Sequence, residues 1–184
     1  MKIAISGSAG CGKTTLVHTL SQAMETAFIP EQYDCFFNHS GRYIQPRQQL
    51  MKLIEEVLDH KHQQENKHTN FIADRSPIDL FNLWLSLDFS ANKKRTDQFQ
   101  QKCEVYLQKY DLIILPPWGA LPMKQVSEAH SPRKRVMKPW VQFRHHSTLI
   151  GIALQWLPVN KLLPIPSHIT HQEERLSFIL KSLQ

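Results

Sequence analysis

The sequence contains little cysteine, and its cysteines are not arranged for disulfide bonding. Only three occur among the 184 residues, and Cys11, Cys35 and Cys103 are scattered along the chain. Small secreted domains that depend on disulfides have dense and usually paired cysteines, so the sequence is not of that class. This cysteine usage favours a reducing compartment, and we expect a cytoplasmic protein.

Long apolar runs are also absent. No stretch of about 18 uninterrupted apolar residues occurs, so we predict no membrane span. The apolar start, residues 1–10, is too short for a signal peptide, because a Gly-rich segment follows at once. With 41% hydrophobic and 21% charged residues, the composition is that of a globular protein that can bury a sizeable core.

Acidic residues are fewer than basic ones, and the formal net charge is +6. A basic excess suits a polyanionic ligand such as a nucleotide. It equally suits a nucleic-acid surface, so the charge alone does not decide between these partners.

Short strand patterns alternate with longer helical patterns along the whole chain. Strands are predicted at residues 2–6, 26–30, 70–74, 111–115 and 161–165. Helices are predicted at residues 14–23, from 46 onward, around 80–87, and at 99–109, 141–156 and 172–183. This alternation favours an α/β fold with a parallel sheet flanked by helices. Since nothing resembles an interdomain linker, we expect a single domain over residues 1–184.

A complete phosphate-binding motif follows the first predicted strand. Residues 7–14 (GSAGCGKT) match G-x-x-x-x-G-K-[ST] between a strand and a helix, which is the required context. The glycines let the backbone wrap around phosphates, and the helix directs its positive N-terminal end at the same charge. The residues predicted to bind the nucleotide are Gly7, Ser8, Ala9, Gly10, Cys11, Gly12, Lys13, Thr14 and Thr15. We expect Lys13 to reach the β- and γ-phosphates of ATP and Thr14 to bind Mg²⁺.

The residues beyond this loop narrow the class of P-loop protein. A GTPase needs N-K-x-D after a late strand, but residues 66–69 (NKHT) lack the acid and precede a strand. Asp74 ends a strand as a Mg²⁺-binding acid would, and Arg75 follows it where many ATPases carry a second acid that activates water. A cation beside the acceptor suits phosphoryl transfer to a substrate.

Asp74-Arg75-Ser76-Pro77 at the end of a strand resembles the D-R or E-R-S element of nucleoside and nucleoside-monophosphate kinases. Glu31, just after the second strand, is similar in place to the acid that approaches the acceptor hydroxyl in deoxynucleoside kinases. The order of these elements resembles the small AAA-type ATPase/kinase group that includes the nicotinamide-riboside kinase domain. The resemblance implies a three-layer P-loop NTPase fold with a five-stranded parallel sheet in the order 2-3-1-4-5.

The resemblance also implies roles for the site residues. Glu31 would position or deprotonate the acceptor, Asp74 would hold Mg²⁺ directly or through water, and Arg75 would contact the acceptor or the transferring phosphoryl group. The predicted catalytic set therefore contains Lys13, Glu31, Asp74 and Arg75, and the predicted metal ligands are Thr14 and Asp74. A structural alternative for Asp74-Arg75 is a surface ion pair beside a helix that Ser76 caps and Pro77 begins.

A basic, proline-containing segment at about residues 116–140 reads as a mobile lid. In P-loop kinases such a lid closes arginines over the phosphates and excludes water. Arg133 and Arg135 are favoured over Lys134, because a guanidinium binds phosphate through two parallel hydrogen bonds. The alternative is a solvated loop.

Several other residues are weaker candidates. Asp34 is an alternative acid to Glu31, and Arg42, Arg47 and Arg144 are further cations for an acidic ligand. Tyr33 and Trp118 are candidates for stacking on an acceptor base. Thr170 and Arg175 follow the fifth strand, where related kinases hold adenine.

The leading hypothesis is an ATP-dependent, Mg²⁺-dependent kinase that phosphorylates a small acceptor, a nucleoside or a nucleotide. The alternative is a P-loop ATPase or regulator that acts on nucleic acid or protein, which includes a kinase of polynucleotide 5′ ends. The sequence leaves open the acceptor's identity and the oligomeric state.

Overall fold

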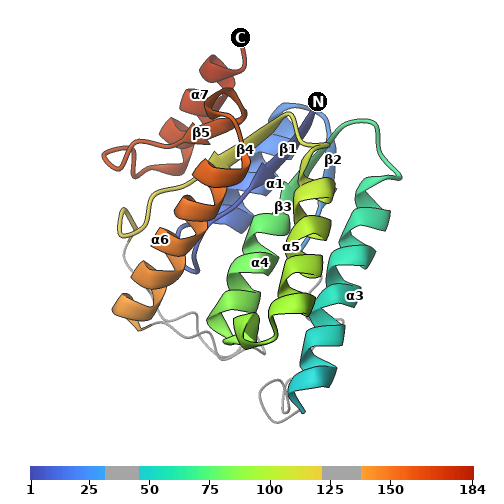
Figure 1. The fold of residues 1–184 in the computed structure, drawn as a ribbon. Helices are drawn as coiled ribbons and strands as arrows, with labels where there is room; N and C mark the ends of the chain where they lie inside the picture. The colour runs from blue at the N-terminus through green and yellow to red at the C-terminus, as the bar shows by residue number, and fades with distance from the viewer. Residues whose placement is uncertain (32–45, 122–137) are drawn as a thin grey trace, which may run out of the picture.

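Five short strands form one parallel sheet at the centre of the molecule (Figure 1). The computed structural model describes residues 1–31, 46–121 and 138–184. The strands are β1 (Lys2–Ile5), β2 (Ala27–Ile29), β3 (Phe71–Asp74), β4 (Leu112–Leu115) and β5 (Leu162–Pro164). Their order in the sheet is β2-β3-β1-β4-β5, and this confirms the predicted order.

Apart from Lys2 and Asp74 at strand ends, the strands consist of apolar residues, because both faces of the sheet are covered. Successive side chains of a strand point to opposite faces. In β1, Ala4 belongs to one hydrophobic core, and Ile3 and Ile5 belong to the other. In β4, Ile114 likewise faces away from Ile113. The sheet therefore separates two cores.

The helices complete a three-layer arrangement. They are α1 (Lys13–Ala23), α3 (Arg47–Glu65), α4 (Pro77–Ser86), α5 (Lys93–Leu107), α6 (Pro139–Trp156) and α7 (Gln172–Ser182), with short 3₁₀ turns η1 (Phe89–Ala91) and η2 (Val159–Lys161). Helices α1 and α7 pack on the smaller core, and α3, α4, α5 and α6 pack on the larger one (Figure 1).

The helix boundaries depart from the predictions where apolar periodicity is missing. The prediction began α5 at residue 99, but the helix begins at Lys93. It starts with two exposed lysines, Lys93 and Lys94, and the Asn92 side chain caps it by accepting a hydrogen bond from Arg95 N at 3.3 Å. Helix α6 begins at Pro139, so the last two residues of the range assigned to the lid are helical.

Parallel strands bring the residues that follow them to one edge of the sheet. Ile5 of β1 lies in register with Asp74 of β3, and Ile29 of β2 lies in register with Ala73. The segments after β1, β2 and β3 therefore meet, as expected at the carboxyl edge of an α/β sheet. Among the described residues, no helix is long and apolar enough to cross a membrane.

Candidate functional site

The loop between β1 and α1 has the backbone conformation that its glycines were predicted to permit. Gly10 and Gly12 have φ values of 84° and 81°, in the left-handed region that other residues adopt only with strain. Gly12 is also the N-cap of α1, and no side chain caps this helix end. The first N–H groups of α1 are therefore available to an anion at the helix N-terminus.

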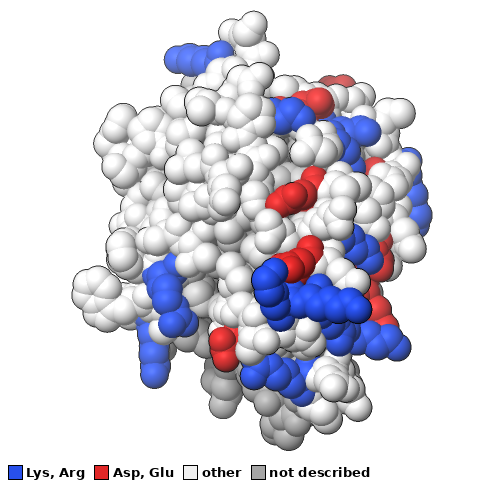
Figure 2. All heavy atoms as spheres, viewed as in Figure 1, with Lys and Arg blue, Asp and Glu red and all other residues white. Residues whose placement is uncertain are grey.

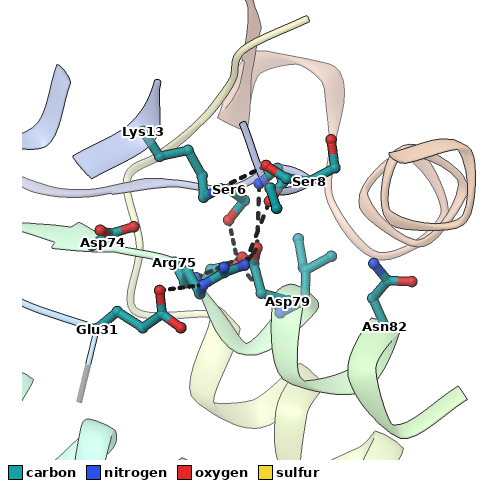
Figure 3. Close-up of polar contacts among 12 residues, drawn as sticks. Ser6, Ser8, Lys13, Glu31, Asp74, Arg75, Asp79 and Asn82 are labelled. Carbon is teal, nitrogen blue, oxygen red and sulfur yellow. Dashed lines mark hydrogen bonds and ion pairs between the residues drawn. The ribbon is translucent and has the colours of Figure 1, made fainter. Parts of the chain in front are cut away.

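Lys13 lies inside the loop and spans it. Its Nζ donates a hydrogen bond to the backbone oxygen of Ser8 at 2.8 Å and lies 3.8 Å from Cys11 Sγ. The side chain is buried and extends toward Ser8 (Figure 3). The hydroxyl of Ser8 is buried without a hydrogen-bond partner among the described residues.

Thr14 and Asp74, the two residues predicted to bind Mg²⁺, lie in contact across 60 residues of sequence. The Thr14 hydroxyl donates to Asp74 Oδ2 at 2.7 Å. The other carboxylate oxygen, Asp74 Oδ1, is buried and has no hydrogen-bond partner among the described residues. Mg²⁺ prefers oxygen ligands and usually keeps several waters, so one carboxylate beside one hydroxyl fits this ion. The residues present therefore suit Mg²⁺ bound together with nucleotide phosphates.

Asp74 is supported from behind by a buried charge cluster. Lys61 of α3 donates to the backbone oxygen of Asp74 at 3.3 Å and pairs with Glu65 at 2.9 Å. Glu65 also pairs with Lys109 at 2.7 Å and accepts a hydrogen bond from the Tyr110 hydroxyl at 2.5 Å. Burial raises the pKa of Glu65, but the charges of Lys61 and Lys109 and the two hydrogen bonds outweigh it and lower the pKa below its ordinary value. Glu65 is therefore ionised at neutral pH.

Glu31 and Arg75 form an ion pair at the ends of β2 and β3. Arg75 Nε lies 2.9 Å from Glu31 Oε2, and the two side chains are 21% and 12% exposed (Figure 3). Arg75 has φ of 71°, an uncommon conformation for a residue with a side chain. Such conformations cost about 1 kcal/mol or more and cluster at functional sites. The predicted acid and the predicted cation are thus brought together beside the loop.

Asp79 is a member of the site that sequence reasoning missed. Its carboxylate accepts hydrogen bonds from Gly7 N at 3.2 Å and Ser76 N at 2.9 Å, and it pairs with Arg75 at 3.2 Å. Ser76 in turn accepts from Ile78 N, which completes a capping box on α4. The helix cap considered as an alternative is therefore real, and it is part of the site. The spacing Ser76-x-x-Asp79 was the available signal.

Helix α6 contributes a second missed contact. Gln142 is buried and its Oε1 accepts from Ala9 N at 3.0 Å. Asn82 of α4 ties α6 in place by donating to the backbone oxygen of His145 at 2.9 Å. The phosphate loop is therefore held by both helices that border it on this side.

The cations of the site also act on two histidines of α6. Burial lowers the pKa of His145, and the charges of Arg144 and Arg75 lower it further. Burial lowers the pKa of His146, and Lys13 adds to this effect. Both imidazoles are therefore neutral at neutral pH, and the positive charge belongs to lysine and arginine.

The remaining candidates lie elsewhere or are not described. Arg133 and Arg135, together with Tyr33, Asp34, Arg42 and Lys134, fall outside the described residues. Arg47 pairs with Asp88 and stacks over the Phe89 ring. Trp118 packs edge-on against Phe143 at 5.2 Å between ring centroids. Arg175 is buried against the loop rather than placed on the surface.

A family model described as an AAA domain matches residues 2–161. The chain belongs to this family. The match runs from β1 to the residue before β5 and includes the phosphate loop, Glu31, Asp74 and Arg75. No curated protein matches the chain.

Solved structures share the fold over nearly the whole chain. The deoxyadenosine kinase of M. mycoides has a TM-score of 0.67 at 16% identity, over 100% of this chain and 98% of that one. NadR in complex with NR has a TM-score of 0.68 at 15% identity over 97% of this chain, which spans only 50% of NadR. Thymidylate kinase from Candida albicans has a TM-score of 0.60 at 14% identity, over 98% and 89% of the two chains. The resemblance to P-loop kinases is thus confirmed at the level of the fold.

Proposed function

We propose that this chain is an ATP-dependent kinase that transfers the γ-phosphoryl group to a small acceptor of the nucleoside or nucleotide class. The observation that carries the proposal is the arrangement around the phosphate loop. Thr14 and Asp74 form one polar pair, which is suited to a metal ion. Glu31, after β2, and Arg75, after β3, form a second polar pair beside it. A kinase needs two such groups of residues, because it holds a metal-bound phosphoryl donor beside a separate acceptor.

The loop and its neighbours would bind the donor. Within residues 7–15, the backbone N–H groups other than those of Gly7 and Ala9, which donate to Asp79 and Gln142, would hold the phosphates of ATP together with Lys13. Thr14 and Asp74 would hold Mg²⁺. Bound Mg²⁺ neutralises charge that develops on the phosphates during transfer. Arg133 and Arg135 are proposed to close over the phosphates as part of the lid, which would exclude water from the reaction.

Glu31 and Arg75 would bind the acceptor. Arg75 presents a planar array of donors that suits phosphate or carboxylate oxygens, and the partly exposed Glu31 carboxylate suits an acceptor hydroxyl. Asp79 fixes the Arg75 guanidinium from the other side. Catalysis would then consist of positioning and charge stabilisation, without a covalent intermediate.

Two observations support a small acceptor over a polymer. The proteins of similar fold include a deoxyadenosine kinase, NadR bound to NR and a thymidylate kinase. On the face shown in Figure 2, basic side chains lie among acidic ones, and on α3 and α5 they form pairs such as Arg95–Glu55 and Lys102–Asp59. On this face, and for the described residues, this pairing differs from the continuous basic stripe that is usual on a nucleic-acid surface.

The test is ADP release from ATP and Mg²⁺, without an acceptor and with ribonucleosides, deoxynucleosides, their monophosphates and an oligonucleotide with a 5′-hydroxyl group. We expect one small acceptor to stimulate ADP release, and Lys13→Ala to abolish the stimulation. The matched control is Lys52→Ala, since Lys52 lies exposed on α3 and pairs only with Glu56 in the contacts described. Stimulation by the oligonucleotide alone, or hydrolysis that no acceptor changes, would contradict the proposal and favour an ATPase or polynucleotide kinase.

A further inference from the structure

Two side chains of α7 contact the phosphate loop from its outer side. Arg175 Nη1 donates to the backbone oxygen of Cys11 at 2.9 Å, and its Nε donates to that of Ile169 at 3.0 Å. Gln172 Nε2 donates to the backbone oxygen of Gly12 at 3.3 Å. Consecutive carbonyl groups of the loop are therefore held by residues about 160 positions further along the chain.

The Gly12 carbonyl also accepts from Leu16 N at 3.1 Å, which is the first hydrogen bond of α1, whereas Arg175 is the one donor to the Cys11 carbonyl in the contacts described. Together these contacts help to set the direction of the N–H groups on the opposite side of the loop. In a trans peptide unit the C=O and N–H bonds point in opposite directions. The carbonyl of Cys11 shares its peptide plane with the N–H of Gly12, and the carbonyl of Gly12 shares its plane with the N–H of Lys13. Holding both carbonyls outward therefore turns both N–H groups toward the concave side, where an anion at the start of α1 would lie.

Arg175 is an unusual residue for this place. It is 0% exposed, and among the described residues no carboxylate pairs with it and its Nη2 has no hydrogen-bond partner. A buried cation costs free energy unless it is paired, and apolar residues of similar volume often serve stability as well or better. Burial lowers the pKa of the Arg175 guanidinium, which reflects this cost. Stability alone thus gives little reason for a guanidinium here.

Gly12 shows how closely α7 approaches the loop. A Cβ atom on this residue would lie 2.7 Å from Gln172 Nε2 and 3.0 Å from Leu121 Cδ1. The glycine therefore admits the α7 side chains as well as the left-handed backbone. Helix α7 also lies beyond residues 2–161, the part of the chain that the family model matches.

We infer that α7 is a clamp that orients the phosphate-binding amides, with Arg175 and Gln172 as positioning residues for the β-phosphate of the nucleotide. The inference rests on the proposed binding of ATP, and it adds determinants outside the motif itself. In this inference Arg175 maintains the conformation of the phosphate loop, and it does not make the adenine contact expected from its position after β5.

The test is ADP affinity, measured by calorimetry with Mg²⁺ and no acceptor, together with the melting temperature of the same proteins without nucleotide. We expect Arg175→Met to weaken ADP binding by about 10- to 100-fold, since a hydrogen bond from a charged group is lost, and Gln172→Leu by about 3- to 10-fold. Glu174→Gln, an exposed change on the same helix, is the matched control and should bind as the unmodified chain does.

A purely structural role predicts another pattern. Arg175→Met and Gln172→Leu would then melt at lower temperature but bind ADP within twofold of the control at a temperature where circular dichroism shows native protein, and this would overturn the inference. If Arg175→Met does not fold, Gln172→Leu decides the matter by the same criterion. A chain that binds ADP but phosphorylates nothing would contradict the kinase proposal and not the clamp, whereas no ADP binding by the unmodified chain would overturn the clamp.

Discussion

The phosphate loop is bordered by two arginines in contrasting surroundings. Arg75, on the α4 side, is partly exposed and lies between two carboxylates, those of Glu31 and Asp79. Arg175, on the α7 side, is fully buried and donates only to backbone oxygens among its described contacts. Both reach the loop, since Arg75 Nη1 lies 3.5 Å from the backbone oxygen of Gly7 and Arg175 Nη1 lies 2.9 Å from that of Cys11.

The surroundings of Arg75 suit a guanidinium that exchanges one partner for another, whereas those of Arg175 suit a guanidinium whose contacts stay fixed. A partly exposed guanidinium beside carboxylates can take a substrate oxygen in place of one partner at modest cost, because water reaches it. A fully buried guanidinium has no such access, and its contacts fix the backbone. We therefore assign turnover to the α4 side and nucleotide affinity to the α7 side.

The largest expected effect is on turnover, and it tests the role assigned to Arg75. Arg75→Met should lower acceptor-dependent turnover by about 100- to 1000-fold, which is typical of removing one group that stabilises transition-state charge. ADP affinity should change by less than about threefold, because the α7 contacts remain. Steady-state kinetics and calorimetry measure the two quantities.

Arg95→Met is the matched control for Arg75→Met. Arg95 is 27% exposed and pairs with Glu55, so it resembles Arg75 in exposure and pairing but lies on α5. Turnover should stay within about twofold of that of the unmodified chain. Equal loss of turnover in both variants would contradict a specific role of Arg75 in turnover.

The next effect concerns a buried cluster that, unlike Arg175, does contain a carboxylate. Glu65→Gln leaves Lys61 and Lys109 buried without their counter-charge and should lower the free energy of unfolding by about 3 kcal/mol at pH 7. The pKa of Glu65 is lowered in the folded state. Its contribution is therefore present above its ordinary value of 4.5 and is lost as the pH falls through the folded pKa.

Urea unfolding between pH 7 and pH 3 checks both parts of this prediction. The loss of stability in acid should be smaller in Glu65→Gln than in the unmodified chain. Glu56→Gln, on the same helix in an exposed pair with Lys52, is the control and should change stability by less than about 0.5 kcal/mol. Parallel pH curves for the unmodified chain and Glu65→Gln would show that Glu65 is not the titrating group.

A smaller effect is expected where the loop meets β3. Thr14→Val removes the hydroxyl that donates to Asp74 and should raise the Mg²⁺ concentration for half-maximal activity by at least about tenfold. Thr19→Val, one turn and a half further along α1, removes a hydroxyl that bonds only to helix backbone in the contacts described. An equal Mg²⁺ requirement in the two variants would argue against Thr14 as a ligand.

The smallest expected effect is on the cap of α4, the helix that carries Asp79, one of the partners of Arg75. Ser76→Ala removes the side-chain acceptor of the capping box and the hydrogen bond from Ser6, and should cost about 1 kcal/mol of stability. Thermal unfolding measures this cost. Ser86→Ala, at the other end of the helix, should lower stability by less. A larger loss for Ser86→Ala than for Ser76→Ala would contradict the importance assigned to the N-terminal cap of α4.

The elements that sequence predicted well are those with local signals. Strands β1, β3 and β4 are short apolar runs, and the phosphate motif lies between a strand and a helix. From the implied strand order, the ends of β1 and β3 are neighbours, so the meeting of Thr14 and Asp74 was predictable. Glu31 and Arg75 were each predicted as site residues from their places after the second and third strands, but their ion pair was not predicted.

The contacts that sequence missed are those that depend on distant packing. Gln142 and Arg175 reach the loop across 133 and 164 residues. Nothing in the neighbourhood of Gln142 distinguishes it from other helix residues, and Arg175 was a candidate for holding adenine but not for contacting the loop. Asp79 had a local signal as a capping residue, but its contact with Gly7 depends on how α4 packs against β1. The first turn of α5 was missed because its exposed residues carry no apolar period.

The most direct test of the central proposal follows the phosphoryl group itself. ATP labelled with ³²P in its γ-phosphoryl group is mixed with Mg²⁺, the chain and the acceptor that most stimulates ADP release, and the products are separated after less than one turnover. The proposal predicts label in the phosphorylated acceptor, in amounts equal to the ADP formed, and none of it with Lys13→Ala. Label found only in inorganic phosphate would contradict the assignment of this chain as a kinase.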